Sequence, residues 1–233
     1  MKIVINNDDF GLSYGQVDGT LFGFEHGIIT STTVLCNRPD KYLLYAAEQA
    51  KNVPEMGLGV HLTLTNGIPM TLGKTIRNSE GKSIKKNEIN QNIDPEEVYQ
   101  EFKAQVENFI RIFNRKPDHV DSHQNIHWLD PIRPVTERIC KEYQLECRGL
   151  NSRFIWQYNL YGMFTLENFE KAVAEAIKNQ YTGLEINCHC AFVDEDLFKS
   201  TSYRHQRVEE LELVCSKGMK DIFDKYGLEK SHY

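Results

Sequence analysis

Residues 2–15 of the chain read KIVINNDDFGLSYG, an apolar run followed by two acidic residues and a short turn. The run at 2–6 is short, with three consecutive apolar residues at its centre, which predicts a buried strand. Residues 14–26 then have the spacing of a helix, which Gly27 would end. Asp8 and Asp9 fall just after the strand. A strand, a polar turn and a helix in this order are the first unit of an α/β fold.

The same alternation continues through the rest of the chain. Strands are expected at 28–35, 57–64, 119–122, 145–149 and 184–188, and helices at 42–52, 95–114, 131–143 and 166–180, with two helical segments from about 203. This order implies parallel strands with right-handed crossovers, and so one α/β domain over 1–233. Residues 66–92 are polar and rich in Gly, Lys and Asn, so we expect an excursion outside the core there. The pattern alone does not separate a barrel from an open sheet, but in both folds ligand sites lie at the carboxyl ends of the strands.

Composition excludes several classes of protein. The 233 residues carry a formal charge of −6 without a basic patch, which argues against nucleic acid as a partner. No apolar run approaches the roughly 18 residues that a membrane span needs. The six cysteines are scattered without a CxxC pair, so we interpret them as reduced thiols. Because the chain starts directly with a strand and not with a signal peptide, the expected location is the cytoplasm.

Candidate metal ligands and acid–base groups stand at the ends of four expected strands. Asp8 and Asp9 follow the first strand, His61 lies in the third, and His123 and His189 follow two later ones. Taken singly, each has a structural explanation: the aspartates would cap a turn, and a histidine in an apolar strand is more often a core residue. Because the carboxyl ends of parallel strands meet at one rim, their joint placement instead predicts a single active site.

These residue types suit metal-dependent hydrolysis. Two imidazoles and a carboxylate form a three-ligand site with open positions, which is how catalytic metal sites are built. A metal there polarises a carbonyl and activates water, while a second carboxylate takes a proton and a histidine gives one to the leaving amine. Nitrogen-rich ligation favours zinc, cobalt or iron over magnesium, which prefers oxygen ligands.

Six blocks of sequence resemble the YdjC-like carbohydrate deacetylases and, among them, the chitooligosaccharide (chitin disaccharide) deacetylases. The blocks are NNDDFGLSYG at 6–15, GIITSTTVLCN at 27–37, GLGVHLTLTNGIP at 57–69, KPDHVDSHQNIHWLDP at 116–131, EINCHCAFVD at 185–194 and TSYRHQRVEELELV at 201–214. The resemblance implies a barrel-like fold of the glycoside hydrolase/deacetylase type and removal of an N-acetyl group from a short N-acetylglucosamine-containing sugar, as in chitin degradation. It also implies a divalent ion, commonly described as magnesium, and a dimer.

The resemblance also assigns roles by position. It implies Asp9, His61 and His123 as metal ligands, Asp8 as the general base and His189 as the general acid. His127, four residues after His123, is expected to face the substrate or to support the metal ligands.

Two positions depart from the usual family sequence. Cys190 stands where a proline usually follows the histidine, so the backbone that carries His189 lacks the ring that would fix it. Asn125 stands where a histidine is frequent. Neither change removes an expected ligand.

Two other functions fit parts of the sequence. A hydrolase that cleaves a phosphorylated disaccharide such as cellobiose phosphate would use two separated carboxylates and no metal, which an adjacent Asp pair with three histidines fits poorly. A non-catalytic sugar-binding regulator would keep the fold without the chemistry, because a fold does not fix a function. The presence of every expected ligand favours the enzyme.

Overall fold

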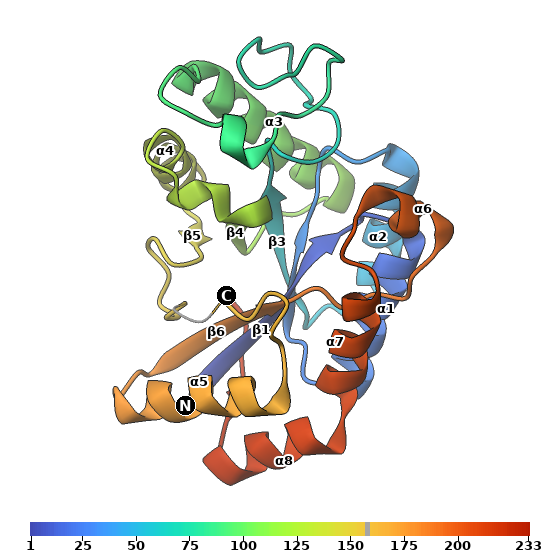
Figure 1. Cartoon of the computed structure of the whole chain (residues 1–233), viewed down its shortest axis with the longest axis vertical. Coiled ribbons are helices and arrows are strands. Elements are labelled where there is room, and N and C mark those ends of the chain that lie inside the picture. The colour runs from blue at the N-terminus through green and yellow to red at the C-terminus, as the bar shows by residue number, and fades with distance from the viewer. Residues whose placement is uncertain (157–158) are drawn as a thin grey trace.

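The computed structural model describes residues 1–156 and 159–233 of the chain (Figure 1). The strands are β1 (Lys2–Phe10), β2 (Ser31–Val34), β3 (Gly57–Leu62), β4 (His119–Ser122), β5 (Glu146–Cys147), β6 (Gly183–Cys188) and β7 (Glu229–Lys230). The α-helices are α1 (Tyr14–His26), α2 (Asp40–Ala50), α3 (Pro95–Phe113), α4 (Arg133–Tyr143), α5 (Leu166–Lys178), α6 (Glu195–Ser200), α7 (His205–Cys215) and α8 (Lys217–Tyr226). Two short 3-10 helices are η1 (Lys86–Glu88) and η2 (His123–Trp128).

The strands form one parallel sheet in the order β5-β4-β3-β2-β1-β6, with β7 paired to the start of β1. Asn6 of β1 lies beside Ser31 of β2 and Asn187 of β6, so neighbouring strands run to the same rim. Beyond Lys2 the whole of β1 is buried, which is the burial that its apolar run predicts for a strand covered on both faces. The expected parallel α/β fold is therefore confirmed.

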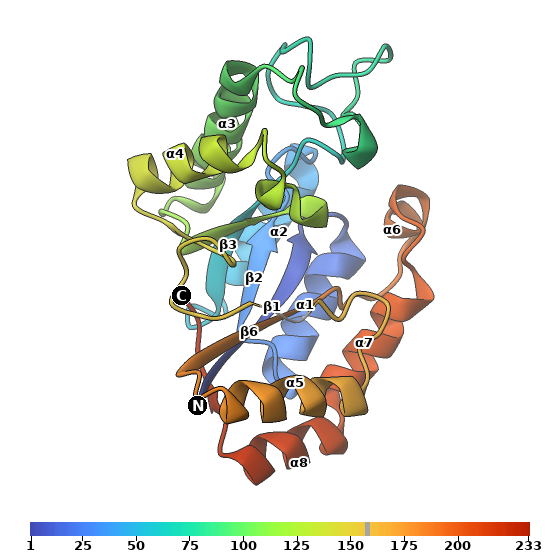
Figure 2. The ribbon, with the colours of Figure 1, turned by 60° about the vertical axis from the view of Figure 1, so that its left-hand side comes forward.

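The two edges of the sheet approach each other. Arg148 directly follows β5 at one edge, yet its Nε donates to Glu185 of β6, at the other edge, at 2.7 Å. Ile155 forms a parallel bridge with Leu184 of β6. Neighbouring strands lie about 4.8 Å apart, so a flat sheet would hold β5 and β6 far from each other. The sheet is therefore curled into a barrel-like form, and Figure 2 shows the curled strands from a second direction.

Helices cover the curled sheet on several sides. Figure 1 shows α3 and α4 on one side, α1, α2 and α7 on another, and α5 and α8 on a third. One apolar cluster includes Val60 of β3 and Phe102 of α3, and a second includes Ile5 of β1, Phe169 of α5 and Ile222 of α8. Burial of each such side chain contributes about 1.5–3 kcal/mol. The two clusters fix the helices on the sheet and leave the carboxyl ends of the strands to polar residues.

Capping residues and helical spacing in the sequence predicted correctly where α1 and α3 begin. α1 has its expected bounds and begins after Ser13, whose Oγ accepts a hydrogen bond from the Gln16 N–H. α3 begins with Pro95 after the capping Asp94. The short elements α6 and β7 were not predicted, and β5 is shorter than the expected strand at 145–149. Within the described part of the chain, no helix is both long enough and apolar enough to cross a membrane.

Residues 66–92 are held against α3 by carboxylates and contain η1 as a short helix. Glu101, which is fully buried, accepts hydrogen bonds from the N–H groups of Met70 and Thr71 at 3.0 and 2.8 Å. Glu97 accepts the Thr75 N–H at 2.7 Å. Because α3 supplies acceptors for these loop donors, the segment is ordered without belonging to the sheet.

Candidate active site

The carboxyl ends of the strands bring the predicted residues to one rim of the barrel. Asp8, Asp9, His123 and His189 all line a cavity of about 520 Å³ there. His61 of β3 is only 1% exposed and lies beneath them, with its Nε2 3.5 Å from Asp9 Oδ1. Residues far apart in the chain therefore meet around one space.

Asp9 combines a strained backbone with a carboxylate oxygen that accepts no hydrogen bond from the described residues. Its φ is 72°, in the left-handed region, where the register between β1 and β2 shifts. Such conformations in non-glycine residues cluster at functional sites. Arg207 of α7 donates to Asp9 Oδ2 at 2.6 Å, whereas Oδ1 is buried without a hydrogen-bond partner among the described residues. An unpaired buried carboxylate oxygen beside an imidazole nitrogen is the arrangement expected of a metal ligand.

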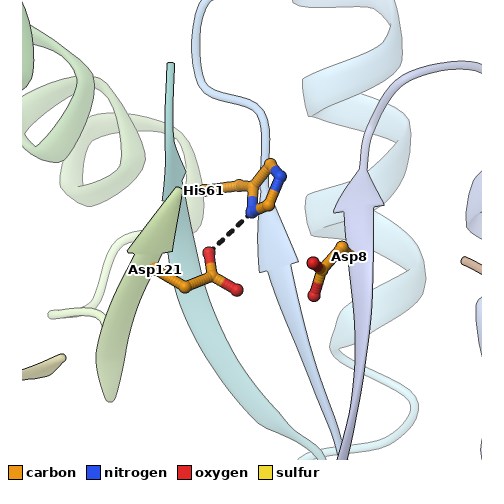
Figure 3. A group of neighbouring side chains, drawn as sticks. All are labelled: Asp8, His61 and Asp121. Carbon is orange, nitrogen blue, oxygen red and sulfur yellow. Dashed lines mark hydrogen bonds and ion pairs between the residues drawn. The ribbon is translucent and has the colours of Figure 1, made fainter. Parts of the chain in front are cut away.

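His61 is oriented by Asp121. Its Nδ1 lies 2.6 Å from Asp121 Oδ1, and Figure 3 shows this contact beside Asp8. Because the carboxylate accepts, Nδ1 carries the proton and Nε2 faces Asp9. Burial by itself lowers the pKa of His61, but nearby carboxylates, Asp121 foremost, raise it to about 9. Asp121 therefore orients His61.

His123 is neutral and lines the same cavity. Its Nδ1 lies 2.7 Å from Thr65 Oγ1, and its ring centroid lies 5.9 Å from that of His61. Burial lowers the pKa of His123 to about 4, so the imidazole keeps a lone pair for a ligand at neutral pH. Gln124 and Asn125, which follow, both have positive φ, so His123 and His127 do not share a regular helical face.

Asp8 is held by groups that favour its ionised form. Arg148 donates to both of its oxygens, at 3.0 and 2.7 Å, and the side-chain amides of Asn6 and Asn187 donate at 2.9 and 3.2 Å. Burial by itself raises the pKa of Asp8. Nearby positive charge, that of the Arg148 guanidinium foremost, has the opposite and stronger effect, so the pKa lies well below its usual range. Asp8 is therefore a carboxylate at any pH near neutrality.

His189 lies between Asp8 and Glu210. Its Nε2 is 3.9 Å from Asp8 Oδ2, its Nδ1 is 3.9 Å from Glu210 Oε2, and its side chain is 13% exposed. The neighbouring Cys190 is clamped by Asn7: its N–H donates to Asn7 Oδ1 at 2.6 Å and its C=O accepts from Asn7 Nδ2 at 3.0 Å. A proline would lack that N–H, so in this chain a pair of hydrogen bonds fixes the backbone next to His189.

His127 lies outside the lining of the cavity. It is fully buried, and its Nδ1 lies 2.5 Å from Ser122 Oγ. Burial lowers the pKa of His127 to about 3, so the ring is neutral. Contact of His127 with a substrate stays a prediction.

Among the described residues, one group of side chains has ligand atoms close enough together to hold a cation. Asp8, His61 and Asp121 each offer a ligand atom, all within 4.8 Å of one another, and such a group fits a divalent metal. However, Arg148 already contacts both carboxylates, at 2.7 Å in each case, and a guanidinium between them opposes a second positive charge. Asp9 and His123 lie outside this compact group. Arg207 contacts Asp9 too, at 2.6 Å, but only through Oδ2, which leaves Oδ1 without a hydrogen bond among the described residues.

Near the cavity, buried carboxylates outnumber buried guanidinium groups. Among the described residues, two guanidinium groups, those of Arg148 and Arg207, face five buried carboxylates. These are Asp8, Asp9, Asp121, Glu185 and Glu210. The raised pKa of His61 reflects the same imbalance, since burial alone would lower it. A divalent cation beside Asp9 would displace the proton that this raised pKa keeps on His61 Nε2 and would supply positive charge in its place, so these residues fit a metal ion.

Sequence reasoning missed the two arginines. Arg148 follows a strand, so the same strand-end argument that selected His123 and His189 could have found it. Arg207 lies on α7, and no local signal separates it from other helical arginines.

The fold is a parallel α/β barrel, and carboxylates and histidines gather at the carboxyl ends of its strands. The chain is therefore a barrel protein with a site of the kind that hydrolytic enzymes of this fold use. The profile of the family described as YdjC-like protein matches residues 2–225, and the chain belongs to this family. A chitooligosaccharide deacetylase of Yersinia enterocolitica is 32% identical, covering 99% of this chain and 97% of its own length. A carbohydrate deacetylase of Halalkalibacterium halodurans is 34% identical, over 92% of this chain and 95% of its own.

The fold is also found in a solved structure. The crystal structure of a proposed cellobiose-phosphate cleavage protein from Enterococcus faecalis superimposes with a TM-score of 0.91 at 29% identity. It covers 100% of this chain and 97% of its own. The family resemblance of the six sequence blocks and the fold that it implies are thus confirmed.

Proposed function

We propose that the protein is a metal-dependent carbohydrate deacetylase that removes the N-acetyl group of a short N-acetylglucosamine-containing sugar. The observation that carries the proposal is the unpaired, buried Oδ1 of Asp9, 3.5 Å from His61 Nε2, at a cavity that also holds Asp8 and His189. The relatives named as deacetylases support the reaction class.

Asp9, His61 and His123 would hold the metal. When bound, a divalent ion there would polarise the acetamide carbonyl and lower the pKa of water. Asp121 keeps the His61 proton on Nδ1 and leaves Nε2 as the ligand atom. Two imidazole donors favour zinc, cobalt or iron over magnesium, whereas the family resemblance points to magnesium, so both kinds of ion belong in the assay.

Asp8 and His189 would divide the proton transfers. Asp8, kept ionised by Arg148, takes a proton as water attacks the carbonyl carbon. His189, 3.9 Å from Asp8, gives a proton to the departing amine, so that acetate and a free amino sugar leave. Glu210 Oε2 lies 3.9 Å from His189 Nδ1, on the other side of the ring from Asp8.

Cleavage of a phosphorylated disaccharide, as the name of the Enterococcus faecalis structure suggests, fits this site less well. A glycosidase needs one carboxylic acid that stays protonated near neutral pH. Burial raises the pKa of Asp8 and of Asp9, but Arg148 and Arg207 respectively lower each to well below its usual range. Neither aspartate in the cavity can therefore serve as the acid.

The test is an assay of acetate release from N-acetylglucosamine and from its β-1,4-linked disaccharide. Protein stripped with a chelator is assayed alone and after addition of zinc, cobalt or magnesium. We expect release only with a metal, and a stoichiometric free amine on the sugar. Cellobiose phosphate serves as the competing substrate. Release of monosaccharide from it without acetate release from any N-acetylated sugar would contradict the proposal, and sugar binding without turnover under every metal would favour a regulator.

A further inference from the structure

Tyr161 presents an aromatic ring to the cavity that the proposed proton transfers do not use. It lines the same cavity as Asp8 and His189 and is 50% exposed. Its ring meets that of His189 edge to face, with centroids 5.2 Å apart and an interplanar angle of 82°. An exposed apolar ring therefore stands directly beside the proposed general acid.

Several contacts hold this ring in place. Tyr161 stacks on Tyr203, with centroids 4.4 Å apart and an interplanar angle of 23°. The Tyr203 hydroxyl donates to Glu210 and accepts the Gly162 N–H at 3.1 Å. The Tyr161 N–H donates to Asn159 Oδ1 at 3.1 Å. Because the ring is fixed before a ligand arrives, little entropy is lost when a ligand stacks on it.

We propose that Tyr161 is the platform for the sugar ring that carries the acetamido group, and thus a specificity-determining residue. The inference rests on the proposed deacetylation. His189 must reach the amide nitrogen, which is bonded directly to a ring carbon, so this sugar ring lies next to His189 and hence to Tyr161. The face of a pyranose that carries its C–H bonds is apolar and rigid, and an aromatic ring complements it.

The polar edge of the sugar would meet the other walls of the cavity. Thr65, Asn66 and Asn125 line one wall, and Ser200 and Ser202 line another. These hydroxyl and amide groups suit the hydroxyls of a sugar, which accept and donate in several directions. An apolar platform within polar walls is the arrangement of a site that orients a small polar ligand.

The experiment compares Tyr161→Ala and Tyr161→Phe with the wild type in acetate release from the monosaccharide and the disaccharide. Loss of the ring should raise KM for both sugars about tenfold, with kcat little changed, because stacking of this kind is worth a tenfold change in affinity. Tyr161→Phe keeps the ring and should keep the wild-type KM. Phe22→Ala is the matched control, since Phe22 of α1 is 41% exposed and is not among the described residues that line the cavity.

Three results would overturn the proposal. These are an unchanged KM in Tyr161→Ala, a rise in KM for the disaccharide only, and a rise as large in Tyr161→Phe. Calorimetric titration of the wild type and Tyr161→Ala with the disaccharide separates this inference from the proposed function. If no sugar releases acetate, the proposed function fails, yet weaker binding by Tyr161→Ala still supports stacking and equal binding refutes it.

Discussion

Two adjacent aspartates acquire different properties because each has its own arginine. Arg148 binds both oxygens of Asp8, whereas Arg207 binds only one oxygen of Asp9. Burial raises the pKa of each carboxyl, and the guanidinium group then lowers it well below its usual range. Asp8 is thus a fixed, ionised carboxylate, which suits the proposed base, while Asp9 keeps one oxygen without a hydrogen bond among the described residues, which suits the proposed metal ligand. Asp9, unlike Asp8, has a left-handed backbone conformation, which in residues other than glycine is most common at functional sites.

Replacement of Asp8 by Asn removes the proposed base and preserves the shape of the side chain. We expect kcat for acetate release to fall about 10²- to 10⁴-fold, since general base catalysis contributes this much. Bound metal, measured by elemental analysis, should stay at the wild-type level because the proposed ligands are untouched. A variant that kept most of the wild-type kcat would exclude Asp8 from the proton transfer.

The clamp on Cys190 gives a second prediction at this scale. Cys190→Pro removes the N–H that donates to Asn7 Oδ1 at 2.6 Å, so a buried acceptor loses a partner. We expect the free energy of unfolding to fall by about 1–3 kcal/mol in a urea titration. Cys190→Ala is the control, because it removes the thiol and keeps the N–H. Equal stability of the proline and alanine variants would show that this hydrogen bond is not what fixes the backbone.

At the scale of elements, segments outside the regular sheet complete the walls of the cavity that the strand ends begin. Lys86 of η1 lines the cavity and donates to the backbone carbonyl of Gln124 in η2 at 2.7 Å. The segment 66–92 is therefore linked both to the cavity and, through Glu101, to α3. Its order depends on side-chain acceptors and not on a β ladder.

Glu101→Ala should release this segment while the barrel stays folded. The change removes a fully buried acceptor for the Met70 and Thr71 N–H groups. We expect faster tryptic cleavage at Lys74, Arg77 or Lys82, identified by mass spectrometry, because exposed flexible loops are cut first. Glu107→Ala, on the same helix but without a contact to the segment in the described structure, is the control. Cleavage at the wild-type rate would mean that other contacts order residues 66–92.

At the scale of the whole molecule, Arg148 joins the two edges of the curled sheet. It follows β5 and contacts Asp121 of β4, Asp8 of β1 and Glu185 of β6, each at 2.7 Å. Burial by itself would lower the pKa of Arg148, but these carboxylates raise it well above its usual value. One charged side chain therefore contributes both to closure of the barrel and to the ionisation of Asp8.

Arg148→Leu should destabilise the whole barrel. The substitution leaves three buried carboxylates without their shared cation, which costs about 3–5 kcal/mol in the free energy of unfolding. Glu185→Gln in the same chain should recover part of the loss, because it removes one of the uncompensated charges. Arg153→Leu, which removes an exposed ion pair with Glu146, should change the thermal midpoint little. Similar midpoints for the two arginine variants would refute a bridging role for Arg148.

Patterns in the sequence were enough to predict the parallel α/β order, the approximate bounds of the longer elements and one shared rim for five side chains, those of Asp8, Asp9, His61, His123 and His189. These follow from local rules, because apolar periodicity places strands and helices, and parallel strands present their carboxyl ends together. The partner of each residue became known from the three-dimensional contacts. Asp121 orients His61, and Asn7 binds the backbone of Cys190. Arg148 binds Asp8 and Arg207 binds Asp9, so the two aspartates have different partners. Such pairs join residues far apart in the chain, and distances across a curled sheet cannot be read from local spacing. Closure of the barrel was undecided for the same reason, since it depends on contacts between the two edge strands and not on the pattern within either.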